Sequence, residues 1–256
     1  MANWQKVRGI IFDLFHTLVS LEVAKAPGQS TPQILGIDPD VWYQHWLKDP
    51  PDYVLGLVPV EVPIKRLAQK LNPAVREEQI QEALRTRHER FRHTLLNIES
   101  ETLDGMRQLR SNGYRIGLIS NCGFDEIASW DESPLAPLFD IAVFSCKVKL
   151  KKPDKEIYLY TAEKLGLAPP ECLYVGNGGS DELTGAERAG MTPVLLTRHL
   201  EAIRPAHITK VMPFARIYVR TVSDLKVLLD HKRILPANLQ SGQHQPPHRP
   251  FPPPSP

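Results

Sequence analysis

The stretch Gly9-Ile10-Ile11-Phe12-Asp13-Leu14-Phe15-His16-Thr17-Leu18 decides the fold. A short apolar run delivers one carboxylate, that of Asp13, to its end, and the apolar pattern then breaks. Such a run is typical of a strand in a parallel sheet, and parallel sheets place their ligands beyond the carboxyl ends of their strands. Asp13 is therefore a candidate nucleophile, and a helix N-cap is the alternative role for it.

Apolar runs of the same kind recur along the chain and alternate with segments of helical spacing. The predicted strands span residues 7–12, 114–120, 141–145, 172–176, 193–197 and 215–219. The predicted helices between and after them include residues 102–111, 155–165, 181–189 and 222–231. This alternation predicts an α/β fold with a Rossmann-like, doubly wound parallel sheet.

One interval breaks the alternation, because roughly eighty residues separate the first strand from the helix before the second, far more than an ordinary connection. Helices predicted within it span residues 40–47, 62–71 and 76–96. We therefore expect a core domain of residues 1–19 and 98–235 and an inserted helical cap of residues 20–97. Residues 236–256 are rich in Pro, Gln and His, which predicts a disordered tail.

Composition limits the function classes. The 256 residues are 42% hydrophobic and 23% charged, with a net charge of +2, which gives no basic excess of the kind that nucleic-acid binding needs. The chain runs directly into its first strand, and no apolar run approaches membrane-spanning length, so we expect a cytoplasmic protein that binds a small molecule. The three cysteines lack metal-ligand spacing. The sequence leaves open whether the chain forms a homodimer.

Polar groups follow three further strands. Ser120 and Asn121 end the second strand, where they either hold an anionic oxygen or cap a helix. Lys152 precedes Pro153 and a new helix, so its ammonium is placed to neutralise an anion. The fourth strand opens into the glycine-rich loop 176–182, where Asp181 replaces the third glycine that a dinucleotide-binding loop requires.

These four segments, in this order, resemble the motifs of the haloacid dehalogenase superfamily, and the insert resembles the C1 cap of that family. The resemblance implies that Asp13 attacks the substrate and forms a covalent aspartyl intermediate, which water hydrolyses. The substrate-binding residues that it implies are Thr17, Ser120, Asn121 and Lys152. Lys152 would also steady the charge on Asp13.

The same resemblance implies a magnesium site, since most members of the family are magnesium-dependent phosphatases. The implied positions are Asp13, the carbonyl of Phe15, Asn177 and Asp181. Two of them depart from the family pattern: Phe15 replaces an acid that transfers protons, and Asn177 replaces a carboxylate ligand, which should lower the affinity for Mg²⁺. His16 could take over the proton transfer, or it caps or packs within its loop.

Three functions therefore stay open. Phosphate monoester hydrolysis leads, because it is the commonest activity of the family. Carbon–halogen hydrolysis, as in metal-free 2-haloacid dehalogenases, is favoured by Phe15 and Asn177, although no arginine occurs between Asp13 and Arg66 to receive the halide. The third is a binding protein that retains the fold without turnover.

The predicted cap carries two groups of residues with open roles. Its aromatic side chains either line a substrate pocket or form core, and its arginine-rich and histidine-rich helix is either a solvated face or a lid that attracts anions. The aromatic group comprises Trp42, Tyr43, Trp46 and Tyr53, and the basic group comprises Arg85, Arg87, His88, Arg90, Arg92 and His93. Cys122 is expected to be a small buried residue.

Overall fold

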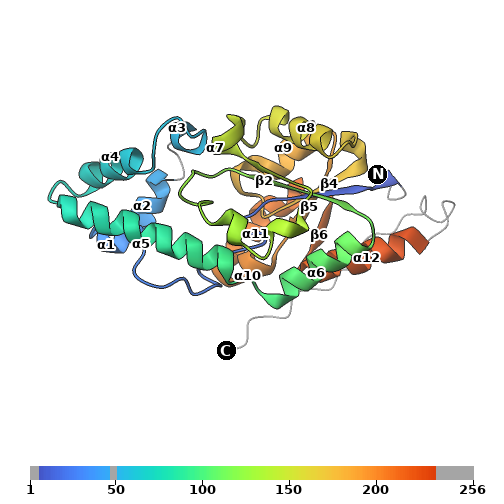
Figure 1. The fold of residues 1–256 in the computed structure, drawn as a ribbon, viewed down its shortest axis with the longest axis horizontal. Helices are drawn as coiled ribbons and strands as arrows, with labels where there is room; N and C mark the ends of the chain where they lie inside the picture. The colour runs from blue at the N-terminus through green and yellow to red at the C-terminus, as the bar shows by residue number, and fades with distance from the viewer. Residues whose placement is uncertain (1–5, 47–50, 235–256) are drawn as a thin grey trace.

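Six parallel strands form one sheet at the centre of the molecule (Figure 1). The computed structural model describes residues 6–46 and 51–234. The strand order is β3-β2-β1-β4-β5-β6. The strands are β1 (Gly9–Phe12), β2 (Arg115–Ser120), β3 (Ile141–Phe144), β4 (Cys172–Gly176), β5 (Thr192–Leu196) and β6 (Ile217–Val219). The predicted α/β fold with a doubly wound parallel sheet is confirmed.

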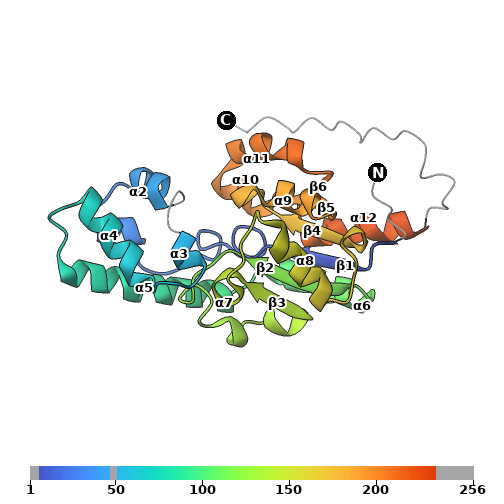
Figure 2. The ribbon, with the colours of Figure 1, turned by 90° about the horizontal axis from the view of Figure 1, so that it is seen from above.

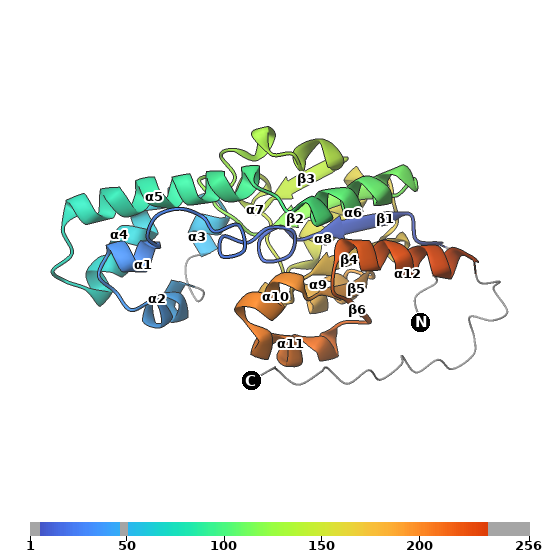
Figure 3. The same cartoon turned by 90° about the horizontal axis from the view of Figure 1, so that it is seen from below.

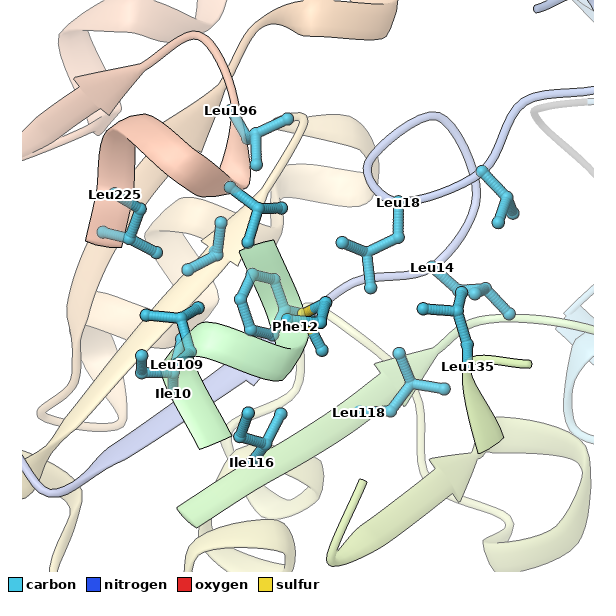
Figure 4. Packing of buried hydrophobic residues seen from close by; sticks show 14 of the residues in the cluster. Ile10, Phe12, Leu14, Leu18, Leu109, Ile116, Leu118, Leu135, Leu196 and Leu225 are labelled. Carbon is cyan, nitrogen blue, oxygen red and sulfur yellow. The ribbon is translucent and has the colours of Figure 1, made fainter. Parts of the chain in front are cut away.

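Helices cover both faces of the sheet. On one face lie α6 (Ser100–Ser111) and α12 (Val222–Ile234), and on the other lie α8 (Lys155–Lys164) and α9 (Glu182–Arg188) (Figure 1). Ile10 and Phe12 of β1 pack into the first layer, where Figure 4 shows them beside Leu109 and Leu225, and Ile11 packs into the second. Burial on both faces explains why β1 is apolar without interruption.

The remaining helices of the core connect or follow the strands. They are α7 (Ser145–Val148), α10 (Arg198–Ile203) and α11 (Pro205–Val211). Short 3₁₀ helices span Trp130–Glu132, Ala136–Leu138, Pro169–Glu171, Gly179–Asp181 and Met212–Phe214. Among the described residues, none of the helices combines the length and apolar content that crossing a membrane requires.

The segment after β1 forms a helical body at one end of the molecule (Figures 1 and 2). Its helices are α1 (Thr31–Ile34), α2 (Pro39–Trp46), α3 (Pro51–Val54), α4 (Glu61–Leu71) and α5 (Glu77–Leu96). An apolar cluster of its own, built on Leu35, Trp42, Ile64 and Ile80, holds these helices together. Helix α5 runs from the far end of this body back to the sheet (Figure 3). We call residues 20–97 the cap; its exact division from the core stays a prediction.

The observed elements differ from the predicted ones mainly at their ends. The ladder of β1 begins at Gly9 instead of Val7, and the helix predicted from Asp181 begins one residue later, because Asp181 has a left-handed backbone with φ +50°. The predicted helix 40–47 is observed as Pro39–Trp46, and Leu47 and the predicted tail 236–256 lie outside the described residues.

The register of the sheet fixes the place of Asp13. Phe12 pairs with Leu118 of β2 and with Val175 of β4, and the Asp13 N–H donates to the Val175 carbonyl at 2.8 Å. Asp13 therefore leaves β1 at the level where β2 and β4 also end. The central position of β1 brings the loops after these neighbouring strands to the nucleophile from both sides.

Candidate active site

A buried ion triad lies at this edge of the sheet. Lys152 Nζ lies 2.5 Å from Asp13 Oδ1 and 2.6 Å from Glu182 Oε2. All three side chains are buried. Although burial by itself lowers the pKa of Lys152, the two carboxylates outweigh that effect and raise it, so the ammonium stays charged at neutral pH. Two carboxylates and one ammonium leave one net negative charge in this group.

The loop after β2 fixes the backbone that carries Lys152. The Asn121 side chain donates from Nδ2 to the Lys152 carbonyl at 2.9 Å and accepts from the Lys152 N–H at 2.8 Å. Both ends of this amide are thus engaged within the protein, and its observed role is to hold the lysine loop. Ser120 is buried at the end of β2 beside Cys122, whose thiol donates to the Ser120 carbonyl at 3.7 Å.

Three donors converge on the Glu182 carboxylate. Besides Lys152, the Tyr174 hydroxyl donates to Oε2 at 2.6 Å and the Gly178 N–H donates to Oε1 at 2.9 Å. Burial, reinforced by the nearby charge of Asp13, raises the pKa of Glu182, and Lys152 opposes this shift. The Glu182 carboxylate packs closely against the end of β4. This packing requires glycine at position 176, because a Cβ there would lie 2.2 Å from Glu182 Oε1.

The other oxygen of the nucleophile is held by two neutral groups. Thr17 Oγ1 donates to Asp13 Oδ2 at 2.6 Å, and Asn177 Nδ2 lies 3.1 Å from the same oxygen. Asn177 Nδ2 also donates to the Phe15 carbonyl at 2.8 Å, while its Oδ1 accepts from the Gly179 N–H at 2.8 Å. The amide orientation is fixed by these contacts, because Oδ1 has a donor and Nδ2 faces acceptors.

This arrangement does not fit Mg²⁺. The resemblance implied that the metal would contact the Asp13 carboxylate and the Phe15 carbonyl, and the Asn177 amide nitrogen already contacts both. Turning the amide would direct its oxygen toward that corner but would leave the Gly179 N–H without its acceptor. Within residues 6–46 and 51–234, no group of three or more His, Cys, Asp or Glu side chains is placed to hold a metal ion.

Asp181 does not join the site that the sequence predicted for it. Its side chain is exposed, and the adjacent Glu182 is buried against Lys152 instead. The left-handed backbone of Ser180 and Asp181 turns the chain so that the second of the two neighbouring acids faces inward. Sequence reasoning missed Glu182 and its partner Tyr174. Their only sequence signal was a second acid in the loop and a tyrosine in an apolar strand.

Phe15 and His16 extend the nucleophile loop toward the cap. The Phe15 ring packs edge-on against Phe91 of α5, with centroids 5.2 Å apart. His16 has a left-handed backbone with φ +61°. Its buried Nδ1 has no hydrogen-bond partner in the part of the chain that the structure describes, and it lies 3.7 Å from Glu22 Oε2. Burial lowers the pKa of His16, so the imidazole is neutral at neutral pH.

The residues with open roles in the cap separate into core, interface and exposed positions, and the exposed ones include Tyr43, Arg85 and His88. Trp42 is buried in the cap cluster and stacks on Trp46, and Tyr53 is buried against the core. Arg87 is largely shielded, whereas Arg92 is exposed. Cys122 is fully buried, as predicted.

Comparisons with known proteins agree with this geometry. A family model described as haloacid dehalogenase-like hydrolase matches residues 7–190, most of the chain. Two relatives differ in their named activity. A glyceraldehyde 3-phosphate phosphatase of Methanothermobacter thermautotrophicus is 31% identical over 119 residues, which cover 45% of this chain and 52% of that one. An (S)-2-haloacid dehalogenase 4A of Burkholderia cepacia is 30% identical over 105 residues, covering 40% and 45%.

The matched stretch thus covers about half the length of each of these relatives. Among solved structures, a HAD phosphatase from Thermococcus onnurineus is similar in fold, with a TM-score of 0.57 at 24% identity, over 89% of this chain and 100% of that one. The family match spans the nucleophile loop, the lysine loop and the glycine-rich loop. The chain therefore belongs to the haloacid dehalogenase-like hydrolase family.

Proposed function

We propose that this chain hydrolyses a small anionic organic substrate through an ester formed on Asp13, without a divalent metal, and that the bond it breaks is a carbon–halogen bond of a 2-haloacid. The observation that carries this proposal is the Asn177 amide nitrogen, which contacts both Asp13 Oδ2 and the Phe15 carbonyl. A metal-independent reaction suits a leaving group that needs neither a Lewis acid nor a proton.

The chemistry follows from the contacts of the two Asp13 oxygens. Oδ2 is held by Thr17 and Asn177, which fixes the rotamer, and among the described residues Oδ1 has a hydrogen bond to Lys152 alone. We expect Oδ1 to attack the carbon that bears the halogen, so that a carbon–oxygen bond forms as the halide leaves with the bonding electron pair. Water then attacks the Asp13 carbonyl carbon. This step releases the 2-hydroxy acid, regenerates the carboxylate and yields one proton.

The absence of an acid at Phe15 supports the same choice. An alkoxide leaving group needs a proton donor, which a phenyl ring cannot be, whereas a halide needs none. The net negative charge of the triad also disfavours a phosphate dianion in the absence of a metal. The Ser120 hydroxyl, at the end of β2, is the group that we expect to hold the substrate carboxylate.

Phosphate monoester hydrolysis is the second candidate. The relative that is a glyceraldehyde 3-phosphate phosphatase supports it. So does His16, whose imidazole could supply the proton that Phe15 cannot. This candidate requires Asn177 to turn and expose its oxygen to Mg²⁺, or another donor to neutralise the phosphoryl group. The cytoplasmic location, the absence of nucleic-acid and membrane partners and the homodimer stay predictions.

A substrate panel tests the proposal. Both enantiomers of 2-chloropropionate and a set of phosphorylated metabolites with an aryl phosphate would be incubated with the protein, with Mg²⁺ or with chelator. We expect halide release that chelator leaves unchanged and that Asp13→Asn abolishes. Phosphate release that requires Mg²⁺ would establish the second candidate instead. Tight binding with no turnover of either substrate class would indicate a binding protein.

A further inference from the structure

Arg87 of α5 joins the cap to the loop that follows β2. Its Nε donates to Asp125 Oδ2 at 2.9 Å, and its Nη2 donates to Glu126 Oε1 at 2.5 Å and to the Tyr53 hydroxyl at 3.0 Å. Tyr53, on α3 of the cap, itself donates to Asp125 Oδ1 at 2.7 Å. Two cap helices and two core carboxylates thus meet at one guanidinium, which we call the Arg87 clamp.

The clamp is enclosed by aromatic rings. The Arg87 guanidinium lies 4.6 Å from the ring centroid of Phe91 and 5.3 Å from that of Trp46. The side chain of Arg87 is only 12% exposed, and those of Asp125 and Glu126 are 16% and 13% exposed. Charged groups shielded to this extent are held together more strongly than a surface ion pair, and they are costly to separate.

Two sets of contacts connect the Arg87 clamp to the loops of the candidate active site. Phe91, which stacks on Arg87, also packs against Phe15, two residues after the nucleophile. Glu126 uses its second oxygen to accept from the Gly123 N–H at 2.9 Å, in the loop that carries Ser120.

Tyr53 lies directly on Gly123. A Cβ at that position would come within 2.1 Å of the tyrosine ring.

From this geometry we propose that Arg87 is a positioning residue: it locks the cap onto the core and, through Phe91 and Glu126, sets the nucleophile loop and the loop of Ser120. The hydrolytic role of those loops rests on the proposed function, but the locking does not. Nothing in this assignment requires Arg87 to touch the substrate.

The charge balance argues against a substrate-binding role for this arginine. Asp125 and Glu126 together carry two negative charges against one positive charge, so the clamp as a whole repels an anion. Both its Nε and its Nη2 are engaged by protein acceptors. We therefore do not assign to Arg87 the role of the halide-binding arginine that the sequence lacks near its nucleophile.

Hydrogen exchange followed by mass spectrometry on the full chain tests the clamp. In Arg87→Met, we expect amides in residues 51–57 and 121–127 to exchange roughly a hundredfold faster, because removal of one partner leaves two buried carboxylates unpaired. Amides of the cap cluster around Ile64 and of strand β1 should keep their protection. Arg87→Lys should restore part of the effect, since it keeps the charge but loses the planar fork.

Arg92→Met is the matched control. Arg92 lies on the same helix and pairs with Glu132 of the core at 3.0 Å, but this ion pair is about half exposed. We expect less than a threefold change in exchange for this variant, as for most surface pairs. If both variants act alike, or if Arg87→Met leaves residues 121–127 unchanged, the clamp assignment is wrong.

Tyr53→Phe covers the case in which Arg87→Met fails to fold. This variant removes one hydroxyl from the clamp and leaves the ring on Gly123, so we expect faster exchange, by a factor of about five, in the same two segments. Unchanged exchange there would overturn the proposal. Turnover of the substrate found in the panel should fall in the order wild type, Arg87→Lys, Arg87→Met. If the panel yields no substrate while the exchange pattern holds, only the proposed function has failed.

Discussion

Removing the charge of Lys152 tests the ion triad most severely. In Lys152→Met, Asp13 and Glu182 stay buried without their common partner. Breaking a buried ion pair in this way costs about 3–5 kcal/mol. Protonation of one of the two carboxyls would relieve this destabilisation, but protonation itself costs about 1.4 kcal/mol for each pH unit above the ordinary pKa of about 4.3. The cost of protonation therefore sets an upper limit on the loss of stability. This limit is about 4 kcal/mol at pH 7.5 and about 2 kcal/mol at pH 5.5.

Urea unfolding at these two pH values measures the effect. Burial already raises the pKa of Glu182 in the folded state, so its cost to stability is present above the unfolded pKa and is relieved as the pH falls. We therefore expect the loss in free energy of unfolding of Lys152→Met, relative to wild type, to shrink by roughly half on going from pH 7.5 to pH 5.5. Lys152→Met/Glu182→Gln should regain most of it at pH 7.5. A deficit that is equal at both pH values, or below about 1 kcal/mol, would refute the reasoning.

Three further predictions concern the surrounding groups. Asn177→Asp should acquire a Mg²⁺-dependent rise in melting temperature that wild type lacks, because it places a carboxylate beside Asp13 Oδ2 and the Phe15 carbonyl; identical melting curves with and without Mg²⁺ would count against this site. If the second candidate holds, His16→Ala should depress phosphate release and flatten its pH profile, whereas halide release, which needs no proton donor, should stay unchanged; unchanged phosphate release would exclude the imidazole as the proton donor. The acid limb of the wild-type pH–rate profile should lie above the ordinary carboxyl range, because burial raises the pKa of Glu182, and Glu182→Gln should shift it; a limb common to both would exclude Glu182 as its source.

The sequence predicted the sheet well because β1 and β4 are buried on both faces. Their apolar runs are continuous, so the predicted and observed bounds of β4 agree at Cys172–Gly176. The ends of strands and helices were harder to predict where backbone conformation, and not hydrophobicity, determines them. Strand β1 begins two residues later than its apolar run, and α9 begins after the left-handed Asp181.

The candidate site was predictable where a residue lies beyond the carboxyl end of a strand, as Asp13 does directly after β1 and Lys152 does in the loop between α7 and α8. Asp13 and Lys152 meet at 2.5 Å, as the predicted roles require. The choice between Asp181 and Glu182 depends on the φ angles of a glycine-rich loop, for which two adjacent acids give no sequence signal. The orientation of the Asn177 amide depends on contacts to distant residues, so the sequence indicated a weakened metal site but not the group that fills it.

The Arg87 clamp lay beyond sequence reasoning for a different reason. Arg87 belongs to a helix crowded with basic residues, which predicted a solvated face or a lid that attracts anions. Its partners Asp125 and Glu126 are almost forty residues away, in a core loop. Only the packing of the cap on the core distinguishes it from the exposed Arg92.

The fate of water oxygen tests the central claim most directly. The protein would turn over its substrate in H₂¹⁸O, and the peptide that contains Asp13 would then be analysed by mass spectrometry. We expect ¹⁸O in the Asp13 carboxylate, because water attacks its carbonyl carbon when the ester is hydrolysed. Label found only in released phosphate would show attack at phosphorus, and label found only in a hydroxy-acid product would show direct attack at carbon without an Asp13 ester. Either result would contradict the proposed mechanism.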